Sequence, residues 1–285
     1  MNSLKKPVII AGPCAAENWE TILEVATVLH KLSQSLSFDY YFKASFDKAN
    51  RTSSQGARGP GLTQAKKWFL DLKERLGIKI LTDVHETSQV ASAAEVCDVL
   101  QIPAFLCRQT DLVVSAIQSG RCVNIKKGQF LSPQAMGQIA KKAIEAQRAL
   151  SDDVKEHQKI FLTERGVSFG YGNLVVDMRS FPVMASNGLP LLLDITHSTQ
   201  LPAMGSDGGS SSAQRSMAPV LARAATATGY LSGYFLEVHP NPALAISDRD
   251  AQLSIPQAKS LLEQLVPFWR ESLDLSLIDQ NFADS

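Results

Sequence analysis

Several residue types that could carry chemistry follow short apolar runs in this 285-residue chain. A thiol, an imidazole and two carboxylates stand out among them, at Cys14, His197, Glu237 and Asp248. Together these groups form the mixed soft and hard ligand set that suits Zn²⁺, Fe²⁺, Mn²⁺ or Co²⁺. They therefore indicate a divalent metal site. The open alternatives are a small packed cysteine, a Cys14–His197 nucleophile pair, and His197 acting as a base or as a donor to phosphate.

Positive charges form a second group of candidates. Lysines and arginines fall at the ends of the apolar runs or just after them, at Lys43, Lys48, Arg51, Arg58, Arg108, Lys126, Lys127, Arg165 and Arg215. Arginine forks and lysine ammonium groups bind phosphate and carboxylate. If these cations converge, they imply one ligand with several negative charges or two anionic ligands. The alternative is a set of ordinary salt bridges.

Side chains suited to proton transfer accompany both groups. Asp83, His85, Asp194 and His239 are candidates for acid–base or supporting roles. Lys126 is also a candidate for a Schiff-base lysine, although the adjacent Lys126-Lys127 pair fits an anion clamp equally well.

Eight apolar runs must position these side chains. Each is continuous rather than alternating, as expected for strands buried on both faces of a parallel sheet. They cover residues 7–12, 40–46, 79–85, 99–104, 122–127, 160–166, 191–197 and 234–239. Segments of helical period lie between or after them, at residues 19–36, 63–76, 132–149 and 257–269, whereas residues 173–187 fit a helix poorly.

Eight strands alternating with helices predict an α/β protein, a (β/α)8 TIM barrel in a single domain over residues 1–285. A doubly wound open sheet is the alternative, but the chain has neither a GxGxxG after its first apolar run nor a GxxxxGK[ST] motif. Function in a barrel collects at the C-terminal ends of the strands, where the polar residues above fall. Residues 205–212, GSDGGSSS, are expected to form either a mobile active-site loop or a plain solvent loop.

The overall charge is balanced, with 28 Lys and Arg against 28 Asp and Glu. This balance argues against a nucleic-acid binder that works through a broadly basic surface. The four cysteines form no CxxC pair, and we find neither a signal-peptide pattern nor a membrane-length apolar run. We therefore expect a cytoplasmic protein with reduced thiols and no membrane partner. We also expect the cations to converge on one mouth of the barrel, with most of the compensating carboxylates elsewhere.

Long motifs in this chain resemble those of the 3-deoxy-D-manno-octulosonate 8-phosphate synthase family. They read FKASFDKANRTS at 42–53, RGPGL at 58–62, TDVHE at 82–86, QIPAFLCRQTD at 101–111, NIKK at 124–127, ERG at 164–166, FGYGNLVVDM at 169–178, DITH at 194–197 and EVHPNP at 237–242. The resemblance implies a (β/α)8 barrel, usually a homotetramer. It also implies a transferase that condenses phosphoenolpyruvate with D-arabinose 5-phosphate and water, giving 3-deoxy-D-manno-octulosonate 8-phosphate, a lipopolysaccharide precursor, and inorganic phosphate.

The resemblance also implies ligand roles. Phosphoenolpyruvate binding falls on Lys43, Ser45, Lys48, Gln101, Ala104, Lys126 and Arg165. Sugar-phosphate binding falls on Asn50, Arg51, Ser53 and Arg108, with Arg108 at a subunit boundary. The sister synthase, which makes 3-deoxy-arabino-heptulosonate 7-phosphate from erythrose 4-phosphate, has proline where this chain has Ala49-Asn50, so the five-carbon sugar is favoured. That synthase and a non-catalytic sugar-phosphate-binding barrel are the alternatives.

The AGPC motif at 11–14 resembles the metal-dependent branch of the family, because the other branch usually has asparagine in place of the cysteine. This branch implies a metal held by Cys14, His197, Glu237 and Asp248. Two departures bear on loop closure and metal affinity: Ser212-Ala213-Gln214-Arg215 replaces Gly-Gly-x-Arg, and Arg249-Asp250-Ala251 replaces Ala-Ser-Thr.

The implied reaction has three steps. C3 of phosphoenolpyruvate attacks the sugar aldehyde, water adds at C2, and the tetrahedral hemiketal phosphate loses phosphate. The candidate catalytic residues are Lys48, Asp83, His85, Lys126 and His197.

Overall fold

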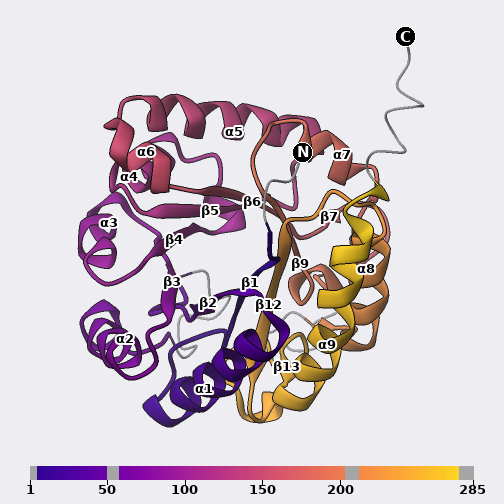
Figure 1. Cartoon of the computed structure of the whole chain (residues 1–285), viewed down its shortest axis with the longest axis horizontal. Coiled ribbons are helices and arrows are strands. Elements are labelled where there is room, and N and C mark those ends of the chain that lie inside the picture. The colour runs from indigo at the N-terminus through magenta and orange to yellow at the C-terminus, as the bar shows by residue number, and fades with distance from the viewer. Residues whose placement is uncertain (1–4, 50–57, 203–211, 276–285) are drawn as a thin grey trace.

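Eight parallel strands close into a barrel in this computed structural model, which describes residues 5–49, 58–202 and 212–275 (Figure 1). In order around the barrel, they are β1 (Val8–Gly12), β2 (Asp39–Lys43), β3 (Lys79–Asp83), β4 (Val99–Ile102), β5 (Cys122–Lys126), β6 (Ile160–Glu164), β9 (Leu191–Asp194) and β12 (Gly233–His239). Pairing of β1 with β12 closes the ring. The predicted (β/α)8 barrel is confirmed, and the open doubly wound sheet is excluded.

Helices surround the barrel and follow its strands along the chain (Figure 1). They are α1 (Trp19–Leu36), α2 (Leu62–Leu76), α3 (Thr87–Ala94), α4 (Thr110–Gln118), α5 (Pro133–Arg148), α6 (Asp152–His157), α7 (Ser180–Ala185), α8 (Ala218–Thr226) and α9 (Ile255–Ser272). The four predicted helical segments match α1, α2, α5 and α9 to within three residues at each end. The segment that fits a helix poorly contains the short strand β8 (Leu174–Val175) and the six residues of α7.

Two apolar clusters build the core. One fills the barrel interior and consists only of residues from the barrel strands: Val8, Ile10, Tyr41, Leu81, Val99, Phe161, Leu192 and Phe235. The partly buried Cys122 of β5 packs against it. The other joins the outward-facing strand residues, such as Ile9 and Ala11, to the buried faces of the helices. Successive residues of a strand point to opposite sides, so a continuous apolar strand serves both clusters.

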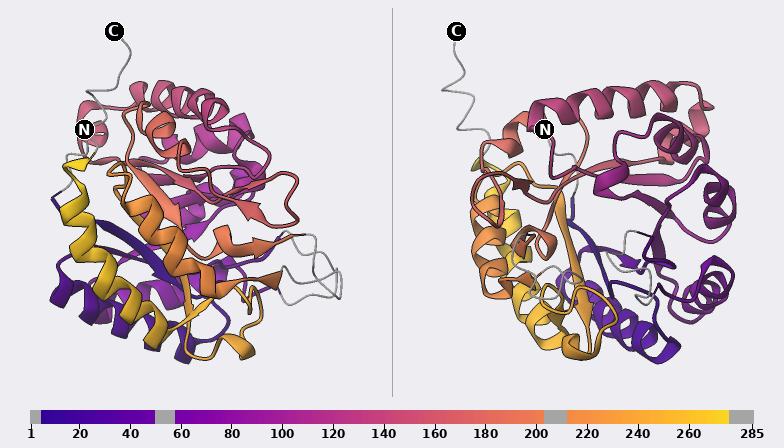
Figure 2. Two further views of the ribbon diagram at one scale, coloured as in Figure 1. Left: turned by 90° about the vertical axis from the view of Figure 1, so that its right-hand side faces the viewer. Right: turned by 180° about the vertical axis from the view of Figure 1, so that it is seen from behind.

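Short elements extend the C-terminal end of the barrel. Two antiparallel ribbons follow β6 and β9, formed by β7 (Val167–Ser168) with β8 and by β10 (Gln200–Leu201) with β11 (Ser212–Ala213). Figure 2 shows both ribbons at the same end of the molecule. Strand β13 (Leu253–Ser254) pairs with the last residues of β12 and leads into α9. These short elements extend the mouth of the barrel over β6, β9 and β12.

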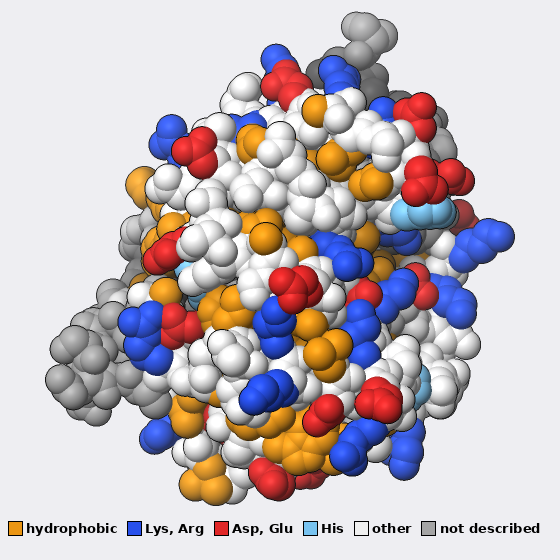
Figure 3. Space-filling view, turned by 90° about the vertical axis from the view of Figure 1, so that its left-hand side faces the viewer, with side chains coloured by type: hydrophobic (Ala, Val, Ile, Leu, Met, Phe, Trp, Pro, Cys, Tyr) orange, Lys and Arg blue, Asp and Glu red, His pale blue; other side chains and the backbone are white. Residues whose placement is uncertain are grey.

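The described surface mixes charges of both signs. On the face seen when the left-hand side of Figure 1 is turned forward, lysine and arginine side chains lie among aspartates and glutamates (Figure 3). Within the described ranges, every helix falls short of the length and apolarity that crossing a membrane requires.

Candidate active site

The candidate residues gather at the C-terminal mouth of the barrel. Six of the eight strands end earlier than the apolar runs predicted, whereas β1 and β12 end as predicted. Several polar side chains therefore stand on the last residue of a strand: Lys43, Asp83, Lys126, Glu164 and Asp194. Cys14, Ser45 and His197 lie two or three residues beyond the ends of β1, β2 and β9. The alternation of the strand directs these side chains into the mouth or toward its rim.

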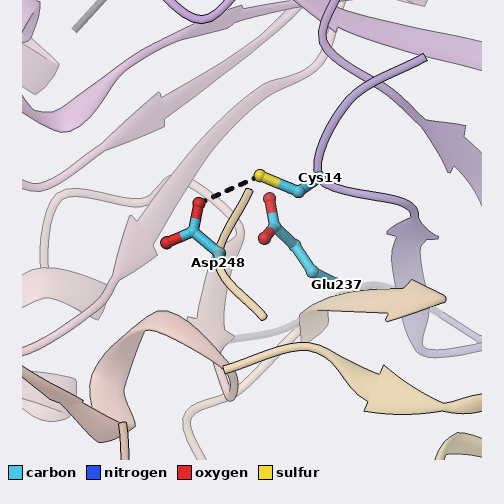
Figure 4. Close-up of side chains that lie close together, drawn as sticks. All are labelled: Cys14, Glu237 and Asp248. Carbon is cyan, nitrogen blue, oxygen red and sulfur yellow. Dashed lines mark hydrogen bonds between the residues drawn. The ribbon is translucent and has the colours of Figure 1, made fainter. Parts of the chain in front are cut away.

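Three of the four predicted metal ligands lie together at one side of the mouth (Figure 4). Candidate ligand atoms of Cys14, Glu237 and Asp248 all lie within 4.8 Å of one another. The thiol of Cys14 donates to Asp248 Oδ2 at 3.0 Å. The fourth, His197, has its Nε2 at 3.6 Å from Glu237 Oε2. The prediction from residue types thus corresponds to a cluster in space, assembled from β12 and the loops that follow β1, β9 and β12.

The chemistry of this cluster fits a divalent cation. Glu237 Oε2 is buried and has no hydrogen-bond partner among the described residues. Asp194 Oδ2 lies 2.8 Å from His197 Nδ1, which leaves Nε2 facing Glu237. Burial, reinforced by the charges of Asp248 and Glu237, raises the pKa of the Cys14 thiol. A divalent cation would coordinate the unpaired oxygen and neutralise the excess negative charge of the cluster.

Two lysines border the cluster. Lys43 is buried and donates to the Cys14 carbonyl at 2.9 Å and to Glu237 Oε1 at 2.5 Å. Lys48 Nζ donates to Ser45 Oγ at 3.0 Å. Burial by itself lowers the pKa of Lys48, but the acidic groups around it, Cys14 and then the carboxylates of Glu237, Asp83 and Asp248, raise the pKa above its ordinary value. Lys48 therefore carries its charge into the mouth at neutral pH.

A buried hydrogen-bond chain crosses five neighbouring strands or their ends. Asp83 accepts from Ser45 Oγ and from Gln101 Nε2. Gln101 Oε1 accepts from Asn124 at 2.8 Å, and Asn124 Oδ1 accepts from Thr163 at 2.6 Å. Despite its burial, Asp83 has a lowered pKa because Lys43 and Lys48 stabilise its charge. Sequence reasoning did not single out Thr163, although a polar residue inside an otherwise apolar strand was a usable signal.

Lys126 and Arg165 lie on the adjoining part of the mouth. Lys126 pairs with Asp194 and has its Nζ 3.1 Å from the centroid of the Phe235 ring. Burial lowers the pKa of Lys126 to about 8. Arg165 donates to Gln200 Oε1 at 2.5 Å, while its buried Nε has no partner among the described residues. These groups can therefore offer positive charge to an anion.

Gln200 is a second residue that the sequence did not reveal. Besides accepting from Arg165, it donates to Asp248 Oδ1 at 3.0 Å. It thereby links the cationic part of the mouth to the candidate metal cluster. Glutamine carries no charge and belongs to no motif that would mark it, so only the fold brings it into view.

Other predicted residues lie apart from this mouth or outside the described part of the chain. Asn50, Arg51 and Ser53 fall in the range 50–57, and most of the glycine-rich stretch 205–212 falls in 203–211, neither of which the structure describes. Arg108 is exposed, and Arg58 pairs with Asp47. Lys127 is buried against Glu164 at 3.3 Å and the Leu131 carbonyl at 3.2 Å.

The remaining candidates are placed as follows. Ala104 is buried where β4 leads into a short turn of 3-10 helix, and Arg215 donates to the Arg249 carbonyl at 2.5 Å. His85 is half-buried beside Phe46, and its Nδ1 has no partner among the described residues.

The expectation that the compensating carboxylates lie elsewhere is wrong. Asp83, Asp194, Glu237 and Asp248 are all at the same mouth as the cations, and two of them, Asp194 and Glu237, pair with lysine or histidine there. A buried charge without a partner costs several kcal/mol, on the order of the stability of a whole domain. Burying the cations therefore required burying acids beside them.

The amino-acid sequence matches the DAHP synthetase I family over residues 4–269. It is 49% identical over 258 residues to a protein of Geotalea daltonii named 2-dehydro-3-deoxyphosphooctonate aldolase, covering 90% of each chain. A protein of the same name from Helicobacter hepaticus is 48% identical over 260 residues, covering 90% of this chain and 95% of that protein. Another, from Campylobacter jejuni, is 46% identical over 265 residues, covering 92% and 96%.

Proposed function

The chain belongs to the DAHP synthetase I family, and we propose that it condenses phosphoenolpyruvate with D-arabinose 5-phosphate and water. The products are inorganic phosphate and 3-deoxy-D-manno-octulosonate 8-phosphate, the compound that the relatives' names call 2-dehydro-3-deoxyphosphooctonate. The observation that carries the proposal is the convergence of buried Lys43, Lys126 and Arg165 on one mouth of the barrel. The sister reaction with erythrose 4-phosphate and a non-catalytic barrel have less support, because the relatives share the octulosonate name.

The first substrate is a phosphorylated carboxylate, which the mouth suits. The residues proposed to hold phosphoenolpyruvate are Lys43, Ser45, Lys48, Gln101, Ala104, Lys126 and Arg165. The unpartnered Nε of Arg165 gives the guanidinium a free donor for an anion. The second substrate is proposed to bind Asn50, Arg51, Ser53 and Arg108.

The reaction then follows from what these groups stabilise. The lysines and Arg165 hold the phosphate while C3 of phosphoenolpyruvate attacks the sugar aldehyde. Water adds at C2, and the tetrahedral hemiketal phosphate collapses with loss of phosphate. Fixed cations stabilise the negative charge that moves during addition and collapse. Lys48, Asp83, His85 and His197 are the proposed proton carriers. Lys48 and Asp83 share Ser45 as a hydrogen-bond partner, His197 Nε2 faces Glu237, and His85 Nδ1 has no partner among the described residues.

Metal dependence is part of the proposal. Cys14, His197, Glu237 and Asp248 would hold a divalent ion, Zn²⁺, Fe²⁺, Mn²⁺ or Co²⁺. When bound, this ion would supply Lewis-acid polarisation of the aldehyde or of the attacking water. The unpartnered Glu237 Oε2 supports this assignment.

A homotetramer is proposed for the working enzyme. The loops after β4, β5 and β6 expose large aromatic side chains at Phe105, Phe130, Phe169 and Tyr171. Exposed apolar groups of this size are typical of protein contacts. Arg108, close to Phe105 in sequence, would then reach the sugar phosphate from the boundary of a neighbouring subunit. A cytoplasmic location also stays a prediction.

A phosphate-release assay tests the function. The protein is incubated with phosphoenolpyruvate and either arabinose 5-phosphate or erythrose 4-phosphate, and a reaction without sugar is the control. Release is expected with the five-carbon sugar only, and it should disappear after verified metal removal and return with Co²⁺ or Mn²⁺. Turnover with erythrose 4-phosphate alone would assign the sister reaction. Full activity in metal-free protein would contradict the metal proposal.

A further inference from the structure

A buried pair of side chains connects the loops that carry two of the candidate metal ligands. Glu17 lies three residues after Cys14 in the loop between β1 and α1, and His239 ends β12, two residues beyond Glu237. His239 Nε2 contacts Glu17 Oε1, and the two side chains are only 6% and 9% exposed. The pair thus joins the start of the barrel to its last strand.

Hydrogen bonds fix the chemistry of this pair. His239 Nδ1 accepts from the backbone N–H of Asn241 at 3.0 Å, so the neutral ring carries its proton on Nε2 and donates it to Glu17. The other oxygen, Glu17 Oε2, accepts from the backbone N–H of Ile246 at 2.9 Å. One carboxylate therefore holds the segment 240–252 at its beginning and again two residues before Asp248.

The backbone at Asp248 needs such support. Its φ is 48°, in the left-handed region, which is disfavoured for a residue with a side chain. The N–H groups of Ala251 and Gln252 both donate to the Asp248 carbonyl at 3.0 Å. In this conformation the carboxylate points at the Cys14 thiol (Figure 4). A residue held against its preference keeps that geometry only while its surroundings stay in place.

We propose that Glu17 is a positioning residue of the metal centre: together with His239 it holds segment 240–252 so that Asp248 stays within reach of Cys14 and Glu237. The proposal rests on the proposed metal site. Glu17 acts through the backbone of Ile246 and through His239, and not on the reacting atoms. Groups that orient metal ligands from outside typically change metal affinity about 10–100-fold when removed.

Cobalt titration of metal-free protein tests this role without an activity assay. A cysteine thiolate bound to Co²⁺ gives a charge-transfer absorption band, which reports both occupancy and ligand geometry. We expect the Kd for Co²⁺ to rise about tenfold in Glu17→Gln and further in Glu17→Ala. The graded effect follows because glutamine keeps one oxygen acceptor, whereas alanine keeps none. Excess Co²⁺ should restore the band in Glu17→Gln.

The matched control is Asp98→Asn. Asp98 is also a carboxylate that accepts from a backbone N–H, that of Ile80 at 2.8 Å, and pairs with a cation, Lys73 at 2.9 Å, but it lies before β4 at the other end of the barrel. This variant should lower thermal stability and leave the cobalt Kd within about twofold of wild type. Wild-type affinity in Glu17→Ala, or an equal loss in Asp98→Asn, would overturn the positioning role. Absence of the charge-transfer band in wild type would overturn the metal site itself.

Discussion

At the scale of single residues, Lys126 combines burial, an aromatic ring and an acidic partner. It is buried over the Phe235 ring, and this burial lowers its pKa to about 8 even though Asp194 is beside it. A bound phosphorylated anion stabilises the charged ammonium, so the pKa of Lys126 in the complex lies above its value in the free protein. Affinity for the anion is therefore full below pH 8 and declines as the free protein loses this proton.

We expect the Kd for phosphoenolpyruvate to rise about tenfold per pH unit above pH 8, as linkage requires for one proton. Titration calorimetry between pH 7 and 9.5 measures this slope. Lys126→Arg is the comparison, because a guanidinium keeps its charge across that range. A Kd independent of pH in wild type would show that Lys126 does not contribute its charge to binding.

Thr163 is expected to affect substrate binding without touching the substrate. Thr163→Val removes the donor to Asn124 Oδ1 and leaves that oxygen buried, which should cost about 1–3 kcal/mol of stability. The substitution should also loosen the hydrogen-bond chain that orients Gln101. We therefore expect KM for phosphoenolpyruvate to rise about fivefold, the equivalent of roughly 1 kcal/mol.

Thr226→Val is the matched control for this variant. Thr226 is equally buried and donates to the Ala222 carbonyl, but it lies at the end of α8 beside Tyr234. It should lose stability with KM unchanged. Equal KM values in the two variants would remove the hydrogen-bond chain from the account of substrate binding.

At the scale of elements, the close approach of β1 and β2 decides one position. A Cβ at Gly12, the last residue of β1, would overlap the Lys43 carbonyl of β2. Gly12→Ala should therefore push the strands apart and destabilise the protein by about 1–3 kcal/mol or more. It should also displace Lys43 and weaken both substrate and metal binding.

Gly77→Ala provides the comparison for this strand contact. Gly77 ends α2 with a φ of 63° and open space around it, so only conformational strain of about 1 kcal/mol is expected. Denaturant unfolding measures the loss of stability in each variant, and the phosphate-release assay measures the loss of activity. If Gly12→Ala kept activity while losing no more stability than Gly77→Ala, the strand contact would not control the site.

The elements were largely predictable from the sequence because their signals are local. Continuous apolar runs located all eight barrel strands, and apolar periodicity with Ser132-Pro133 located α5. Strand ends were less predictable. The run through residue 46 continues as buried chain after β2 stops at Lys43. Ala44 and Phe46 pack into the outer core there, and an isolated bridge between Ser45 and Ala15 replaces the continuous strand pairing.

The candidate site was predictable in its residue types and in the strands that carry them, but not in its pairings. Cys14, Glu237 and Asp248 were expected together because strands one and eight meet when a barrel closes, and the structure places them so. The pairing of acids with cations was not foreseen, since sequence position does not reveal which buried charges face one another. Gln200 and Thr163 were not predicted for the same reason, because their importance comes from hydrogen-bond partners more than 30 residues away in the sequence.

At the scale of the whole molecule, the exposed aromatic side chains bear on assembly. Phe105→Ser combined with Phe169→Ser should shift the proposed tetramer toward smaller species, because both exposed rings follow barrel strands on the same side. Sedimentation velocity across protein concentrations measures the shift. Leu70→Ser is the control, since Leu70 is about half exposed on α2, away from those loops. An unchanged assembly in the double variant would exclude this surface as the contact.

The closure of β1 against β12 also has a consequence for folding during synthesis on the ribosome. Cys14 and Asp248 are separated by 234 positions. At a translation rate of ~5–20 residues per second, the cysteine is made roughly 10–50 seconds before its aspartate partner. During that interval the nascent chain cannot assemble the cluster. Binding of the proposed metal ion would therefore come late and would report a finished barrel, and a chain released early would be recognisable by its inability to retain the ion.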